Sequence, residues 1–238
     1  MYQCPSVARA CLIRVTRNDA CGVPLAAASA KSRVMTTCFA SLALEPHYEN
    51  SDDIIAKDAC GRIQVQDIGC QYLTRFNGTL KLAGRWVTPL MEMVLRTRPL
   101  MGDELATVGT LVDAYGGALP SYDTATDTCD DNFTLELWAK NSLSGSCAVA
   151  VGQPGRYVQI ALPRTQRWII SGGLMLDGKA PELEFKFSAV KNQAWVPPVP
   201  AEWAAADAIT ELFAWRAKRT IPTSNVVTTT DGQCNFET

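Results

Sequence analysis

The chain has 238 residues, 47% of them hydrophobic and 19% charged, which is the composition of a folded protein. Its formal net charge is −2, so it lacks the basic excess that drives nucleic-acid binding through phosphate neutralisation. No apolar run approaches the roughly 20 residues that span a bilayer, and the first residues have no secretion-signal pattern. We therefore expect a protein that is made and kept in the cytoplasm, without a membrane partner.

The first predicted element is a strand that leads into a turn. Residues 13–16 alternate β-branched and polar side chains, with the period of two that is typical of a half-buried strand. Residues 18–24 then contain Asn, Asp, Gly and Pro, the residue types that dominate turns. The segment therefore predicts a short strand that ends in a tight reversal.

The next segments predict one long strand, a loop and a hairpin. Residues 33–45 alternate over the longest run, and the even-numbered positions are the more apolar, so we expect them to face the core. Residues 45–53 are predicted to form a polar loop. Residues 54–57 and 63–66 are predicted to pair as a hairpin around a turn at 58–61.

Further along, strands resume around one predicted helix. Residues 76–83 alternate again, whereas the apolar spacing in residues 88–98 fits a short amphipathic helix that stops before Pro99. The following segment, with Gly116-Gly117 and several aspartates, is predicted to be an exposed loop. The remaining predicted strands cover residues 133–139, 157–162, 168–170, 174–175 and 183–190.

These elements predict a mainly β protein. Roughly nine strands and a helix in the middle favour a β-sandwich or barrel-like fold with a flanking α-helix. After the prolines at 197, 198 and 200, residues 202–218 become alanine-rich and compatible with a helix, and residues 221–238 are polar. We therefore predict a β-sandwich domain over residues 1–198 and a C-terminal helix and extended arm over residues 199–238.

The nine cysteines are dispersed, and none has the C-x-x-C spacing of a zinc knuckle. Most are expected to be small buried apolar side chains, because a cytoplasmic protein rarely forms disulfides. Structural zinc remains a weaker alternative. Oxidation after release into an oxidising medium is also open, with Cys11–Cys21 and Cys60–Cys70 as the pairs closest in sequence.

The sequence carries little catalytic chemistry. His47 is the single histidine, it lies in a polar segment, and no nucleophile elbow, phosphate loop, dinucleotide fingerprint or zinc-protease helix occurs. Two acidic clusters were considered as sites for a hard cation such as calcium, but neither has EF-hand spacing. These clusters are Glu45, Glu49, Asp52 and Asp53, and Asp123, Asp127, Asp130 and Asp131. We therefore expect no enzyme, no catalytic residue, no metal and no cofactor.

Four segments resemble the major tail tube proteins of long-tailed, siphovirus-type phages that infect actinobacteria. The first is an Arg-Val-Thr-Arg strand followed by an Asp-x-Cys-Gly-x-Pro turn, at residues 14–24. The second is the strand, acidic segment and Ala-Cys-Gly hairpin at residues 39–67. The third covers residues 127–138, and the fourth is Trp215-Arg216 followed by a Thr/Pro stretch and Cys234. The alanine-rich residues 202–214 depart from the family pattern.

This resemblance implies a virion structural protein of the phage tail, assembled in the host cytoplasm. Such proteins polymerise as hexameric rings, which stack head to tail into the tube through which genomic DNA is ejected into the host. The implied fold is a β-sandwich with a flanking helix, in which each subunit contributes a sheet to a continuous inner barrel. The implied partners are further copies of the chain, the tape measure protein and tail terminator or tail-tip proteins, with double-stranded DNA as transported cargo.

A tube of this kind predicts two groups of site residues. A lumen that lets DNA slide should repel phosphate, so acidic side chains are expected to face the lumen or the junction between rings. These are Glu45, Glu49, Asp52, Asp53, Asp58 and Asp67. Arg14, Arg17, Trp215 and Arg216 are expected to make subunit contacts. Charge reversal at Arg14 or Arg17 is expected to block polymerisation before it alters folding.

Two other classes of protein stay open at this point. One is a different β-rich virion protein, such as a capsid decoration protein or a tail-tip or distal tail protein, which would form trimers or a single ring. The other is a small hydrolase that uses the acidic segments, which would need a pair of carboxylates in unlike environments.

Overall fold

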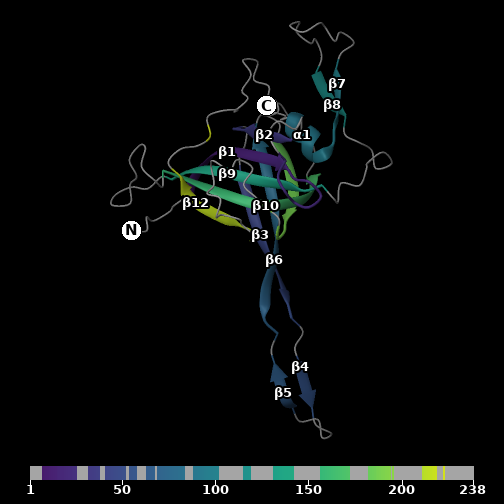
Figure 1. Ribbon diagram of the computed structural model, residues 1–238, viewed down its shortest axis with the longest axis vertical. Coiled ribbons are helices and arrows are strands. Elements are labelled where there is room, and N and C mark those ends of the chain that lie inside the picture. The colour runs from purple at the N-terminus through teal and green to yellow at the C-terminus, as the bar shows by residue number, and fades with distance from the viewer. Residues whose placement is uncertain are drawn as a thin grey trace.

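The structure is a computed structural model of the chain (Figure 1). It describes residues 7–25, 32–37, 41–51, 54–57, 63–67, 69–83, 88–101, 115–118, 131–141, 156–171, 182–193, 195, 211–218 and 222. One helix is described, α1 (Thr88–Leu95). The strands are β1 (Val7–Arg17), β2 (Arg33–Thr36), β3 (Ser41–Asn50), β4 (Ile54–Lys57), β5 (Ile63–Asp67), β6 (Gln71–Ala83), β7 (Arg98–Met101), β8 (Tyr115–Ala118), β9 (Phe133–Asn141), β10 (Tyr157–Ile170), β11 (Glu182–Ala189) and β12 (Ala214–Lys218).

Eight of these strands form one antiparallel sheet. Its order is β2-β1-β9-β10-β11-β6-β3, and β12 pairs with β10 beside this path. Two smaller antiparallel pairs, β4 with β5 and β7 with β8, lie outside the sheet. The predicted mainly β class is therefore confirmed.

The long strand β10 joins two parts of the sheet. Residues 157–161 lie between β9 and β12, whereas residues 165–170 pair with β11. The register shifts between Leu162 and Thr165 and again between Gln166 and Ile169. Such irregularities bend a strand and increase its twist. We call β2, β1, β9, β12 and the start of β10 the first half-sheet, and the end of β10 with β11, β6 and β3 the second half-sheet.

A single large core cluster links both half-sheets to α1. Its buried members include Ile13, Val15, Leu135 and Leu137 from the first half-sheet, Leu80, Leu82 and Leu183 from the second, and Leu90, Met93 and Val94 from α1. Trp168 of β10 lies among the aromatic side chains of this cluster. Its ring is stacked on Phe187 at a centroid distance of 4.6 Å and meets Phe133 and Phe185 edge-on at 6.3 and 6.1 Å. The core therefore depends on β10 contributing to both parts of the sheet.

Helix α1 confirms the predicted helix and flanks this core. Pro89 fits the first turn, where the N–H that proline lacks would have no intrahelical acceptor. The helix ends at Leu95, and Arg96 adopts a left-handed backbone with φ of 53°. Arg96 then donates two hydrogen bonds of 2.7 Å to the two carboxylate oxygens of Asp131, which lies two residues before the start of β9. This bidentate pair ties the end of the helix to the start of a central strand.

The predicted turn after β1 is also confirmed. The backbone N–H of Gly22 donates to the carbonyl of Asp19 at 2.9 Å, and the N–H of Val23 donates to Oδ1 of Asp19 at 2.8 Å. Gly22 has a φ of 90°, which favours glycine. Its carbonyl accepts a hydrogen bond of 2.8 Å from Nδ2 of Asn192, so the turn is attached to the segment after β11.

The prediction of one strand over residues 33–45 is wrong. The segment forms two strands, β2 and β3, which lie at opposite ends of the sheet. The polar loop predicted at 45–53 is also wrong for residues 45–50, which continue β3 because each of them pairs with a residue of β6. The expected inward face is confirmed for β3, where Leu42 and Leu44 pack against the core, but on β2 Arg33 and Met35 are buried as well as Val34, so both faces of that strand are covered.

The C-terminal helix is wrong for residues 214–218, which form strand β12. Because β12 pairs with β10, part of the predicted arm belongs to the main sheet, so the predicted boundary at residue 198 does not separate it from the β domain. The expected loop at Gly116-Gly117 is likewise a strand, β8. The rest of the predicted helix, residues 202–210, and the strand at 174–175 lie outside the described residues. The 54–66 hairpin is confirmed by β4 and β5.

Gly78 gives a direct test of this packing. It pairs with Phe187, and a Cβ at position 78 would overlap the Phe187 ring, which is stacked on Trp168. We expect Gly78→Ala to lower the free energy of unfolding by about 1–3 kcal/mol, the usual cost of overpacking. Urea denaturation measures this change. The matched control is Asn77→Ala at the neighbouring exposed position, with an expected change within about 0.5 kcal/mol; equal effects would contradict the packing argument.

Candidate assembly surfaces

A long β-hairpin projects from the body of the protein. Beyond the sheet, residues 47–50 of β3 and 71–75 of β6 continue as a two-stranded ribbon, and β4 and β5 lie at its far end (Figure 1). Ser51 and Cys70 join the two parts: the N–H of Ser51 donates to the Cys70 carbonyl at 3.0 Å, and the N–H of Cys70 donates to Oγ of Ser51 at 2.8 Å. We call residues 47–50 and 71–75, together with β4 and β5, the arm.

The arm exposes large aromatic side chains. Tyr48 is 54% exposed and Tyr72 is 51% exposed. Tyr72 pairs with Glu49 and Tyr48 pairs with Leu73, so the two tyrosines point to opposite faces of the ribbon. None of the side chains described at residues 47–50 and 71–75 belongs to a core cluster. A two-stranded hairpin is at best marginally stable alone in water, so the arm has apolar surface that a partner would stabilise.

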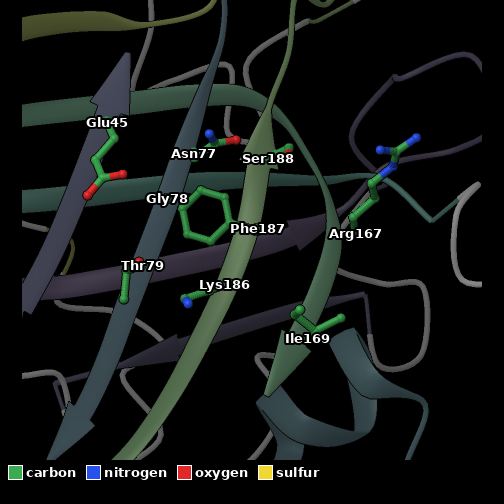
Figure 2. Close-up of a pocket in the computed structure, with 9 residues that line it drawn as sticks. All are labelled: Glu45, Asn77, Gly78, Thr79, Arg167, Ile169, Lys186, Phe187 and Ser188. Atoms are coloured by element: carbon green, nitrogen blue, oxygen red, sulfur yellow. The ribbon is translucent and has the colours of Figure 1, made fainter. Parts of the chain in front are cut away.

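A groove of about 480 Å³ lies over the second half-sheet (Figure 2). Its lining comes from β3, β6, β11 and the end of β10. The lining residues are Glu45, Asn77, Gly78, Thr79, Arg167, Ile169, Lys186, Phe187 and Ser188. Most of them occupy the outward positions of their strands, while Gly78 and Phe187 belong to the buried face.

The groove has two exposed cations and an exposed aliphatic side chain. Arg167 and Lys186 are both exposed, and within the described part of the chain neither side chain makes a hydrogen bond or an ion pair. Arg167 has a φ of 58°, an uncommon conformation for a non-glycine residue, at the register shift in β10. Ile169 is 56% exposed. Glu45 is the one carboxylate among the lining residues.

An ion pair lies beside this groove on the same strands. Lys81 Nζ is 3.1 Å from Oε2 of Glu184, and the two residues face each other across β6 and β11. Hydrogen bonds from Ser171 and from Lys81 hold the pKa of Glu184 below its ordinary value. The charge of Lys186 lowers this pKa as well, so the carboxylate is charged at neutral pH, pairs with Lys81 and partly compensates Lys186.

The structure describes three of the six predicted acidic residues, and these lie on the arm or at its root. Glu45 and Glu49 are exposed on β3, Glu45 in the groove and Glu49 on the arm. Asp67 is the last residue of β5 and pairs with Ile54. Asp52, Asp53 and Asp58 lie outside the described residues.

Arg14 lies inside the subunit rather than at its surface. Its side chain is 1% exposed, and both Nε and Nη2 lie 2.7 Å from Oε2 of Glu136, which is fully buried. The guanidinium also lies 4.9 Å from the centroid of the Trp138 ring. Gln159 donates to the other oxygen of Glu136 at 2.9 Å, and Nε of Arg216 donates to Oε1 of Gln159 at 3.0 Å. A polar chain thus crosses β1, β9, β10 and β12.

This arrangement changes the interpretation of the four predicted subunit contacts. Because Arg14 is buried and paired with Glu136, its charge reversal is expected to destabilise the folded subunit. This replaces the expectation that the change blocks polymerisation before it alters folding. Arg216 belongs to the same hydrogen-bond network, through Gln159. Arg17 is 43% exposed and lies 3.3 Å from Asp131, and Trp215 is 55% exposed on β12. These last two have surface available to a neighbouring subunit.

Cys11 and Cys21 are not joined by a disulfide in the structure, Cys70 forms none either, and Cys60 lies outside the described residues. Within the described ranges, no cluster of three or more His, Cys, Asp or Glu side chains is arranged to hold a metal ion. The same ranges contain no helix with the length and apolarity needed to cross a membrane.

Comparisons with known proteins found no matching family model and no matching curated protein. Among solved structures, a chain of the "Cryo-EM structure of the anti-feeding prophage (AFP) baseplate, 6-fold symmetrised" is similar with a TM-score of 0.31 and 10% identity. The match covers 78% of this chain and 92% of that chain. At this TM-score the similarity carries no argument about fold or function.

The buried ion pair between Arg14 and Glu136 is expected to contribute to the free energy of unfolding. Arg14→Met leaves the Glu136 carboxylate buried without its cation, so we expect the free energy of unfolding to fall by about 3–5 kcal/mol. Chemical denaturation of the isolated chain measures it. The double variant Arg14→Met/Glu136→Leu removes both charges and should recover much of this loss. A single variant as stable as the unmodified chain would contradict the assignment of Arg14 to folding.

Proposed function

We propose that this chain is the structural subunit of a phage tail tube, in which hexameric rings stack head to tail into a conduit for genome ejection. The observation that carries the proposal is the arm, which projects from the body and exposes Tyr48 and Tyr72 where no core of its own covers them. The resemblance of residues 14–24, 39–67, 127–138 and 215–234 to actinophage major tail tube proteins supports the same function.

An extended arm of this kind suits an open polymer. An arm on one side of a subunit that binds a different surface of the next subunit makes a head-to-tail contact, and repeating that contact builds a filament or a ring. The described sheet also has strands at its margins, among them β2 and β3, and pairing between marginal strands is one way in which neighbouring subunits would join in one ring. Contacts between rings and contacts within a ring would thus use separate parts of the molecule.

The electrostatics suit DNA as cargo rather than as a bound ligand. The chain carries a net charge of −2, so it offers no general attraction to phosphate. Between residues 46 and 70 the sequence has five acidic and two basic side chains. In the proposed tube the acidic side chains of the arm and its root lie at the lumen or at the ring junction. The tape measure protein would occupy the lumen before DNA, and terminator and tail-tip proteins would cap the ends.

Electron microscopy of the purified protein tests this function. We expect negatively stained samples at high concentration to contain hollow tubes with a regular axial repeat and sixfold projections of single rings. Trimers, or single rings that never stack, would instead indicate a capsid decoration or tail-tip protein. Monomers at every concentration, with the tape measure and terminator proteins present as well, would contradict the proposal.

The arm variants give a sharper prediction. We expect Tyr48→Ser/Tyr72→Ser to abolish tube formation, since exposed aromatic rings are strong contributors when an interface buries them. Because both side chains are about half exposed in the isolated subunit, its thermal unfolding midpoint should change little. Sedimentation and microscopy measure assembly.

The matched control is Tyr48→Phe/Tyr72→Phe, which keeps both rings and should keep assembly. Tubes of normal length from the serine variant would show that the arm is not an assembly element.

A further inference from the structure

We propose that the groove over the second half-sheet receives the arm of a neighbouring copy of this chain. This inference rests on the proposed function, and it names the surface that the arm contacts. It commits to a second copy as occupant, on three observations: the charges of the groove, the exposed apolar side chains on both surfaces, and the position of the groove relative to its own arm.

The charges of the two surfaces are complementary. Arg167 and Lys186 are exposed in the groove and neither side chain makes an ion pair in the described part of the chain, although Glu184, which is paired with Lys81, also interacts electrostatically with Lys186. Residues 47–75, the sequence span of the arm, hold five acidic and three basic side chains, a net charge of −2, and Glu49 is exposed on the described part. Glu45 lies on β3 at the root of the arm, and its negative charge offsets one of the two positive charges of the groove. An acidic hairpin therefore fits this groove better than a basic or neutral one.

The exposed apolar side chains also correspond. Among the residues that the structure describes, four large hydrophobic side chains are exposed: Tyr48, Tyr72, Ile169 and Trp215. Two of these lie on the arm, and Ile169 lies in the groove. Contact between an arm tyrosine and Ile169 would bury both, and the surrounding polar side chains of Asn77 and Ser188 would form the rim that interfaces typically have.

The arm is placed to contact the groove of another copy rather than the groove of its own subunit. Glu45 and Asn77 line the groove and pair with each other directly at the root of the arm. Tyr48 follows Glu45 by three residues along the same extended strand, about 10 Å further out. A paired ribbon does not fold back over such a distance, so the arm leads away from its own groove. Arm and groove are different surfaces, so their contact is head to tail and repeats along a stack.

Charge reversal in the groove tests the inference. We expect Arg167→Glu/Lys186→Glu to raise the critical concentration for tube formation about tenfold or more, as expected when interface charges become repulsive. The unfolding midpoint should be unchanged, because both side chains are exposed. The matched control is Lys140→Glu/Lys191→Glu, which reverses two exposed cations outside the groove and should leave the critical concentration within about twofold. Equal effects of the two variants would overturn the inference.

A second measurement locates the contact directly. A photo-crosslinking amino acid at position 48 or 72 should link, in assembled tubes, to peptides of β10 or β11 from another copy. Mixing Glu49→Lys with the groove variant should also restore copolymers, since the reversed charges then attract. If tubes form and the crosslinks map elsewhere, the groove is not the docking surface, and the proposed function stands. If the unmodified chain never assembles, the proposed function fails and this inference fails with it.

Discussion

The backbone pairing of β10 is the constraint on which the rest of the structure depends. One strand of 14 residues pairs with β9 and β12 near its start and with β11 near its end, so both half-sheets are attached to it. Trp168 lies on the same strand among aromatic side chains of β9 and β11. The register shifts in β10 therefore determine how the two half-sheets meet, and they also bring Arg167 and Ile169 outward into the groove.

Around this strand the protein combines a rigid body with an unsupported extension. In the body, Arg14, Glu136, Gln159 and Arg216 satisfy one another across four strands. Hydrogen bonds within a buried network are strong because the local dielectric is low, and each member is costly to remove. The arm has no comparable core, and its tyrosines remain exposed. The proposed assembly uses this difference between a packed body and an exposed arm.

The basic side chains of the body fall into two groups, those paired within the subunit and those exposed on its surface. Arg14 is neutralised inside the subunit and Arg96 is neutralised by Asp131, whereas Arg167 and Lys186 are exposed and make no side-chain ion pair with the described residues. Surface charges of this kind contribute little to the stability of one subunit but determine which surfaces meet and in which orientation. Buried arginines such as Arg14 therefore stabilise the fold, whereas the exposed cations Arg167 and Lys186 are free to contribute to the proposed contact between copies.

The local pattern of side chains by itself determined the mainly β class, helix α1, the 54–66 hairpin, the turn after β1 and the inward positions of Val34, Leu42 and Leu44, because these depend on periodicity and turn chemistry within a few residues. Tertiary structure decided the rest. Residues 33–50 became two distant strands through pairing with β1 and β6, and residues 214–218 became a strand because β10 offered them an edge, against their helical composition.

Burial of Arg14 was hidden for the same reason: its partner Glu136 is 122 residues away, and period-two alternation does not show that both faces of a strand are covered. The groove was missed too, although Glu184, Lys186 and Ser188 alternate as an outward face, since only long-range pairing brings them beside β3, β6 and β10.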